Sequence, residues 1–151
     1  MNIRQIDRRI INAFRLVSPI VSKLAFFLVF FWFGVLKVLD LSPAHPMVGS
    51  LLAKTMPFMQ LEPFMVLFGL FEMLIGLLFL IPRAERVVFP LLAFHLITTL
   101  MPLVLLPSVA WSAPFTPTLE GQYMIKNIVI IALAMAMVAD MKPLPRPSSR
   151  S

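Results

Sequence analysis

The chain has 151 residues, of which 60% are hydrophobic and 13% are charged, and its net charge is +6. A soluble domain of this length cannot bury so much apolar surface, because small domains leave a large fraction of their surface in water. The absence of cysteine excludes disulfides, thiolate metal sites and iron–sulfur clusters within the chain. The composition therefore predicts an integral membrane protein without a metal site.

The first 18 residues predict an amphipathic helix of their own. Apolar residues recur at spacings of three and four over residues 2–17, and four arginines occupy the other positions. Such a helix lies on the inner leaflet with its basic side toward the lipid headgroups. A disordered basic segment is the alternative. Pro19 is expected to start the first span, where its missing N–H costs nothing.

Four apolar stretches follow, each close to the ~20 residues that cross a ~30 Å hydrocarbon core as a helix. The spans are expected at residues 19–41, 63–81, 87–107 and 122–139. The tight link at residues 82–86 makes spans two and three an antiparallel hairpin. The predicted fold class is all-α, an integral membrane four-helix antiparallel bundle over residues 19–141.

The connections between the spans differ in length and in expected structure. Residues 47–56 predict a short helix in the outer interface, because the segment is apolar but too short to span. The second outer connection, residues 108–121, follows Pro107 and contains Pro114 and Pro117 together with Trp111 and Phe115, which indicates an interfacial cap. Residues 142–151 are rich in proline and serine and predict a disordered tail.

The basic residues are distributed unevenly over the two sides of the bundle. Five lie in the head up to residue 23, two in the link between spans two and three, and three in the tail, whereas the other connections contain only Lys54. Basic residues favour the cytoplasmic side, so both termini are expected in the cytoplasm. The positive charge thus indicates topology and contact with anionic lipid, and no nucleic-acid partner is expected.

Each span carries one ionisable residue, and such residues inside a membrane often mark function. Glu72 lies between Gly69 and Gly76 at spacings of three and four, so that both glycines share its face. Because glycine permits close helix approach in membranes, the carboxyl group is expected to face packed protein. A functional role and a purely structural buried pair remain equally open for Glu72.

The two lysines lie near the outer ends of their spans. Lys37 shares a face with Gly34, but it could also extend to the interface or pair locally with Asp40. Lys126 shares a face with Gln122 and adjoins Asn127, which predicts a polar lining. Extension of Lys126 to the interface is the alternative.

His95 lies in the middle of span three, and Thr98 and Thr99 follow on the same stripe. Such a histidine is either a hydrogen-bonded packing residue or a ligand or proton-relay group. The other histidine, His45, lies in the outer loop, so a bis-histidine haem site is not expected. The topology predicts that Lys37, Glu72, His95 and Lys126 converge on a semi-buried polar pocket open to the outside. Its cationic excess would attract an anionic or carbonyl-bearing headgroup.

Three segments resemble the DoxX-like superfamily of small four-helix membrane proteins, in particular its YkgB-like branch. They are Gly34 to Lys37 (GVLK), Gly69 to Gly76 (GLFEMLIG) and Pro114 to Ala132 (PFTPTLEGQYMIKNIVIIA), and the similarity covers residues 20–140. The resemblance implies a four-helix bundle in the bacterial inner membrane, linked in some members to oxidant defence or to quinone-linked oxidoreductases. Members of this branch tend to have an acidic residue where this chain has Asn127.

Three functions follow as hypotheses. The first is an accessory subunit or binder of an amphiphile, such as a quinone or lipid, that works with a membrane redox partner protein or as a homo-oligomer. The second is a quinone-linked membrane oxidoreductase that uses Glu72 and His95 for proton transfer and needs a separate redox partner. The third is a small proton-coupled transporter, for which four helices without an internal repeat would have to oligomerise.

Overall fold

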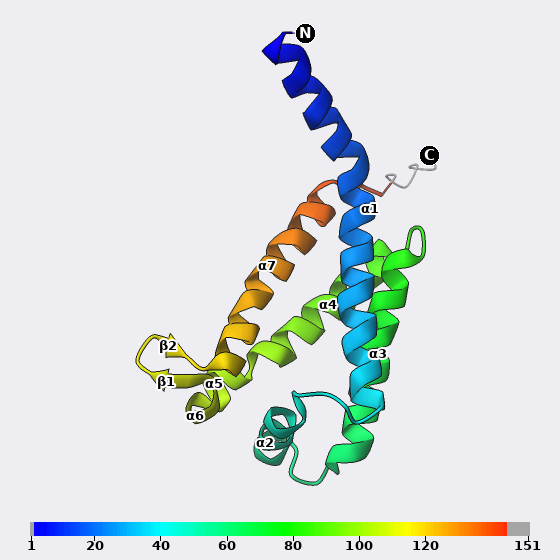
Figure 1. Cartoon of the computed structure of the whole chain (residues 1–151). Coiled ribbons are helices and arrows are strands. Elements are labelled where there is room, and N and C mark those ends of the chain that lie inside the picture. Colours follow the sequence, from blue (N-terminus) through cyan, green and yellow to red (C-terminus); the bar gives the residue numbers. More distant parts are fainter. Residues whose placement is uncertain (1, 145–151) are drawn as a thin grey trace, which may run out of the picture.

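The computed structural model describes residues 2–144, which are mainly helical. Four helices are long and apolar enough to cross a membrane, and they run alternately in opposite directions (Figure 1). Within the described residues they are α1 (Ile3–Val38), α3 (Leu61–Leu80), α4 (Glu85–Leu100) continued by α5 (Pro102–Leu105), and α7 (Leu119–Ala139). The chain is therefore a multi-pass membrane protein. Helices α3 and α7 begin and end within three residues of the expected spans.

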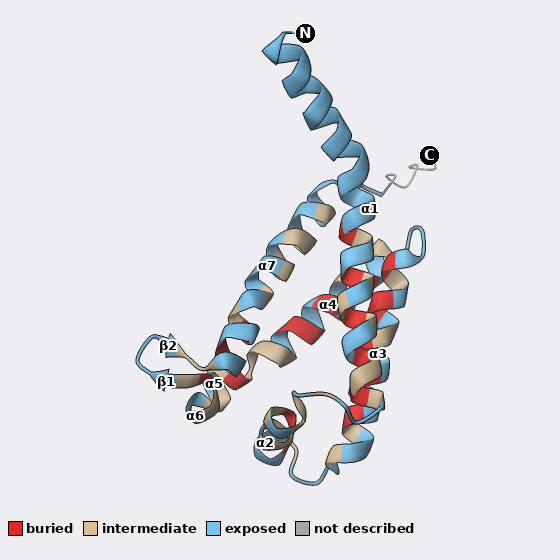
Figure 2. Ribbon diagram, in the orientation of Figure 1, coloured by how far each residue is buried: buried red, intermediate tan, exposed pale blue. Residues whose placement is uncertain are grey.

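Helix α1 is one continuous helix of 36 residues, whereas the sequence predicts a break before Pro19. At ~1.5 Å per residue it is ~54 Å long, well beyond a ~30 Å hydrocarbon core. Pro19 removes one backbone hydrogen bond, but with helix-forming residues on both sides it bends the helix instead of ending it. Figure 1 shows the N-terminal part inclined to the rest of α1, and Figure 2 shows this part exposed throughout.

The connection between α1 and α3 contains α2 (His45–Thr55), which confirms the short helix expected in this loop. Its side chains Val48 and Leu52 are buried. Lys54, in its last turn, donates a hydrogen bond of 2.7 Å to the carbonyl oxygen of Leu105. Helix α2 is thereby held against the connection between α4 and α7.

The connection from α4 to α7 has more structure than the sequence predicts. It contains two single helical turns and a small antiparallel hairpin: α5 (Pro102–Leu105), α6 (Pro107–Ala110), β1 (Trp111–Ala113) and β2 (Thr116–Pro117). Trp111 donates its indole N–H to the carbonyl oxygen of Leu103 at 3.0 Å. Thr118 caps α7 by accepting from the backbone N–H of Gly121 at 3.1 Å. The chain between residues 142 and 144 has no regular structure, and the rest of the expected tail lies outside the described residues.

The closest helix packing is between α1 and α3. A Cβ atom on Gly34 would lie 2.5 Å from the carbonyl oxygen of Gly69, and one on Gly69 would lie 2.6 Å from that of Gly34. A Cβ atom on Gly76 would lie 2.8 Å from the backbone nitrogen of Phe31. These positions admit only glycine, because any side chain would push the two backbones apart. The expectation that the Gly69–Gly76 face meets packed protein is confirmed.

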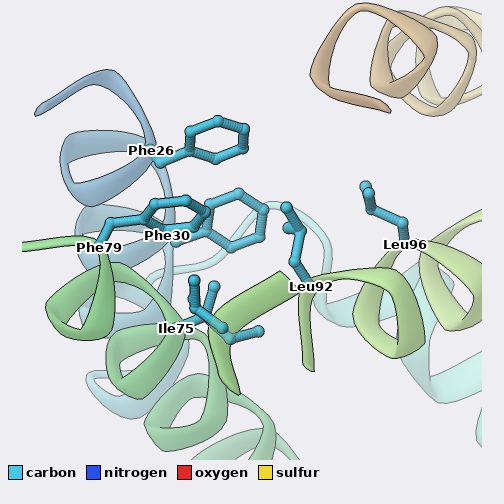
Figure 3. Close-up of a cluster of buried hydrophobic side chains, with 7 residues drawn as sticks. Phe26, Phe30, Ile75, Phe79, Leu92 and Leu96 are labelled. Carbon is cyan, nitrogen blue, oxygen red and sulfur yellow. The ribbon is translucent and has the colours of Figure 1, made fainter. Parts of the chain in front are cut away.

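The apolar core lies where α1, α3 and α4 meet. Figure 3 shows its side chains converging from these helices: Phe26, Phe30, Ile75, Phe79, Leu92 and Leu96, with Val88 completing the cluster. The rings of Phe26 and Phe79 stack with their centroids 4.2 Å apart. The aromatic residues of α1 therefore fall into two groups. Phe26 and Phe30 are buried in the core, whereas Trp32 and Phe33 are 59% and 53% exposed.

Candidate functional site

An ion pair joins α1 to α3 next to the glycine contact. Gly34 lies three residues before Lys37, and Gly69 lies three residues before Glu72, so each glycine shares a helix face with one partner. The Lys37 Nζ atom lies 2.6 Å from Glu72 Oε2, and the two side chains are 8% and 5% exposed. The close backbone approach thus places the ammonium and carboxylate groups within hydrogen-bond distance inside the protein.

The alternatives that the sequence leaves open for Lys37 do not describe this structure. Lys37 is buried, so its side chain does not extend to the interface. Asp40 lies beside His45 instead, with its Oδ1 atom 2.6 Å from Nδ1 of that histidine. The partner of Lys37 comes from another helix because the Gly34 face turns it toward α3.

His95 reaches the same site from α4. Its Nε2 atom lies 3.5 Å from Glu72 Oε1, and its side chain is 5% exposed. The imidazole stacks on the ring of Phe68 with centroids 5.3 Å apart, and it meets the ring of Phe30 edge-on at 5.1 Å. The ammonium of Lys37 lies 5.3 Å from the centroid of the same Phe68 ring, within the range of a cation–π contact.

The three polar groups form one chain, with the Glu72 carboxylate in the centre. One of its oxygens faces Lys37 and the other faces His95. A carboxylate only accepts hydrogen bonds, so it favours the imidazole tautomer that carries the proton on Nε2. At 3.5 Å this contact is electrostatic rather than a short hydrogen bond.

The other ring nitrogen of His95 is the unusual atom of the site. Within the described residues, Nδ1 of His95 is buried and has no hydrogen-bond partner. An unsatisfied buried polar atom costs about 1–3 kcal/mol. With the proton on Nε2, this nitrogen presents a lone pair and can accept a hydrogen bond. The site thus contains a buried acceptor whose hydrogen bond is not made within the described residues.

The predicted convergence of four ionisable residues extends only to three. Lys126 is exposed on α7, and its ammonium lies 5.0 Å from the centroid of Tyr123, a residue of the same helix. Gln122 is exposed as well. The reason is helical geometry: α7 buries Gly121 and Met124, and Lys126 lies about 200° around the helix from Met124.

The other two residues predicted for the polar pocket, Thr98 and Asn127, form hydrogen bonds away from the Glu72 carboxylate. Thr98 donates its hydroxyl to the carbonyl oxygen of His95 at 2.7 Å, one turn back on the same helix. Asn127 is half-buried and donates to the hydroxyl of Thr99 at 3.4 Å, which links α7 to α4. Neither contact touches the carboxylate of Glu72. Thr98 and Asn127 thus support the helices around the site.

The sequence analysis does not single out Phe30 and Phe68 as part of the site. Both have the right spacing, since Phe68 precedes Glu72 by four residues and Phe30 precedes Gly34 by four. The i, i+4 rule therefore places each on the same face as a site residue. This spacing can be read from the sequence, but the many other aromatic residues in the same spans make these two hard to distinguish.

No family model, curated protein or solved structure matches this chain. Among residues 2–144, no three histidine, aspartate or glutamate side chains gather in a way that could hold a metal ion. The site is thus characterised by its own geometry, as a buried Lys–Glu–His cluster in a multi-pass membrane protein.

Proposed function

We propose that this chain is a small DoxX-like protein of the bacterial inner membrane that binds a hydroxyl-bearing amphiphile at His95, with a quinol as the best-fitting class. The observation that carries the proposal is the buried, unpartnered Nδ1 atom of His95 beside an ion pair. Ionisable residues inside a membrane are rare and are typically functional. An acceptor in this position is complementary to the hydroxyl of a quinol or of a lipid.

The aromatic surroundings favour a flat ring over an alkyl alcohol. The rings of Phe30, Phe68 and Phe71 lie around the imidazole with centroids 5.1–6.2 Å from it. Aromatic rings pack well in offset or edge-on arrangements at such distances. A quinol ring that displaces one of these phenyl groups would keep both the apolar packing and a hydrogen bond to Nδ1.

A binding role fits the chain better than independent redox catalysis. The sequence contains no cysteine, so a thiolate-bound electron carrier would have to come from another protein. We therefore infer an accessory role, in which this chain binds the amphiphile and a membrane redox partner exchanges electrons with it. The resemblance to the DoxX-like superfamily supports the same connection with quinone-linked systems.

Two substitutions of His95 separate this function from simple packing. His95→Asn keeps a polar acceptor near the position of Nδ1, whereas His95→Gln keeps a polar group near Nε2 and Glu72. Titrated with decylubiquinol in detergent, His95→Gln should bind about tenfold more weakly than the native chain, because one buried hydrogen bond is lost. His95→Asn should stay within about threefold.

The dimethyl ether of the same quinol is the matched ligand control, because it cannot donate a hydrogen bond. It should bind the native chain as weakly as the quinol binds the His95→Gln variant. Equal affinity of quinol and ether, or no saturable binding beyond partition into the micelle, would contradict the proposal.

A proton-coupled transporter is the second candidate. The specific observation in its favour is the 3.5 Å contact between Glu72 Oε1 and His95 Nε2, which aligns two proton-exchanging groups. Proton-dependent flux in proteoliposomes that disappears with Glu72→Gln would favour this function over amphiphile binding.

A further inference from the structure

A second site lies at the other end of the helices, where the basic residues gather. A cavity of about 480 Å³ is bounded by α1 around Pro19, by the turn between α3 and α4, and by the C-terminal end of α7. This volume lies within the ~300–1,000 Å³ range of small-molecule sites. The Lys37–Glu72–His95 cluster is not part of its lining.

The polar wall of the cavity carries an excess of positive charge. Four basic side chains and two carboxylates contribute to it: Lys23, Arg83, Arg86, Lys142, Glu85 and Asp140. Lys23 and Glu85 form a 2.6 Å ion pair, and the remaining charged side chains of the lining are two arginines, Lys142 and one carboxylate, Asp140. The formal charge of the lining is therefore +2.

A hydrogen bond joins α4 to the C-terminal end of the chain at this cavity. The guanidinium of Arg86 donates a hydrogen bond of 2.8 Å to the carbonyl oxygen of Lys142. It connects the first turn of α4 with the chain that leaves α7, so residues 56 positions apart line the same cavity. Arg86 is thereby held beside the chain that leaves α7, and Arg83, three residues earlier, lines the same cavity.

The rest of the lining is apolar. Pro19 from α1 and Leu133, Ala136 and Met137 from α7 line the same cavity as the basic residues. These α7 residues lie toward the middle of the helix from Asp140, so the apolar wall continues into the membrane-spanning part. The cavity is thus charged at one end and apolar along its wall, which matches an amphiphile with an anionic head.

We propose that this cavity binds the phosphate headgroup of an anionic phospholipid, with an acyl chain along α7. Arginine recognises phosphate oxygens through paired N–H donors. Two arginines line this cavity, and its net positive charge attracts an anion. Basic residues at the cytoplasmic end of spans are also where anionic headgroups concentrate. This site does not depend on the proposed function of His95.

The test uses the full chain in detergent micelles, titrated with dioleoyl-phosphatidylglycerol and followed by native mass spectrometry. The native chain should retain one such lipid, and dioleoyl-phosphatidylcholine at the same concentration should not replace it. Arg83→Gln combined with Arg86→Gln should raise the half-saturating lipid concentration by roughly thirtyfold, about fivefold for each arginine.

The matched control is Arg4→Gln combined with Arg8→Gln, which removes the same charge from the exposed N-terminal part of α1. It should change the half-saturating concentration by less than about threefold, because screening limits the effect of distant surface charges. An equal loss in both double variants would show diffuse attraction and overturn the proposal. Inorganic phosphate that binds as tightly as the lipid would overturn the assignment to a phospholipid.

A gain-of-binding variant keeps the test decisive if the arginine variant fails to fold. Asp140→Asn removes one of the two carboxylates of the lining, so it should tighten phosphatidylglycerol binding by about fivefold. Unchanged or weaker binding would contradict the proposal. The His95→Gln variant should retain the phospholipid fully, which separates this site from the quinol site.

Discussion

Replacing Glu72 by Gln should destabilise the chain far more than replacing both Glu72 and Lys37. The single change leaves the Lys37 ammonium buried without its carboxylate, and removal of one partner of a buried pair typically costs about 3–5 kcal/mol. The glutamine oxygen can still accept a hydrogen bond from the ammonium and Phe68 stays 5.3 Å away, but no negative charge balances the buried cation. The double variant Lys37→Met with Glu72→Gln buries no charge and should lie within about 1–2 kcal/mol of the native chain.

A second ion pair in the same molecule provides the matched control. Lys23 Nζ and Glu85 Oε1 are also 2.6 Å apart, but their side chains are 31% and 24% exposed. Because the two distances are equal, a difference in coupling reports the effect of burial and not of separation. The Lys23→Met and Glu85→Gln cycle should give a coupling energy below about 1 kcal/mol, against about 3 kcal/mol for Lys37 and Glu72.

Both cycles are measured by reversible unfolding in mixed micelles of increasing dodecyl sulfate content, followed by the fluorescence of Trp32 and Trp111. Polar contacts between membrane helices average only about 0.6 kcal/mol in such cycles, since groups also find partners in the unfolded state. Coupling of that size at Lys37–Glu72, or equal coupling in the two pairs, would refute the reasoning from burial.

Two further predictions concern helix packing and topology. Gly34→Ala should cost about 1–3 kcal/mol, because its Cβ would lie 2.5 Å from the carbonyl oxygen of Gly69, whereas Gly49→Ala should cost less than about 1 kcal/mol. The same unfolding titration checks this, and similar losses would argue against the close α1–α3 contact. Because the chain lacks cysteine, a membrane-impermeant maleimide should label Ser50→Cys in intact cells, and Asn2→Cys only after lysis. The reverse pattern would contradict cytoplasmic termini.

Part of the candidate site could be predicted from the sequence because it depends on local helical geometry. The spacing of Gly69, Glu72 and Gly76 defines one face of α3 whatever lies beside it, and the same holds for Gly34 and Lys37 on α1. The tight packing of these faces follows from the small size of glycine. The choice of Glu72 rather than Asp40 as the partner of Lys37 required the structure, because both were within reach of its long side chain.

Outside the site, the sequence predicts some features of the fold and misses others. The sequence predicts the short helix α2, since the segment is apolar and too short to cross a membrane. It does not predict that α1 continues through Pro19, because a proline both starts and bends helices and only the flanking residues decide which. The sequence also does not predict the β1–β2 hairpin, since its two strands have only five residues in all and no run of alternating apolar and polar side chains.

By itself, the sequence determined the membrane environment, the four spanning helices and the inward-facing glycine surfaces. These follow from hydrocarbon thickness and from the 3.6-residue period, which act on each segment separately. Only the tertiary structure decided that His95 joins Lys37 and Glu72 while Lys126 does not. Those outcomes depend on how α4 and α7 are rotated and inclined against the α1–α3 pair, and that orientation results from the packing of all the helices together.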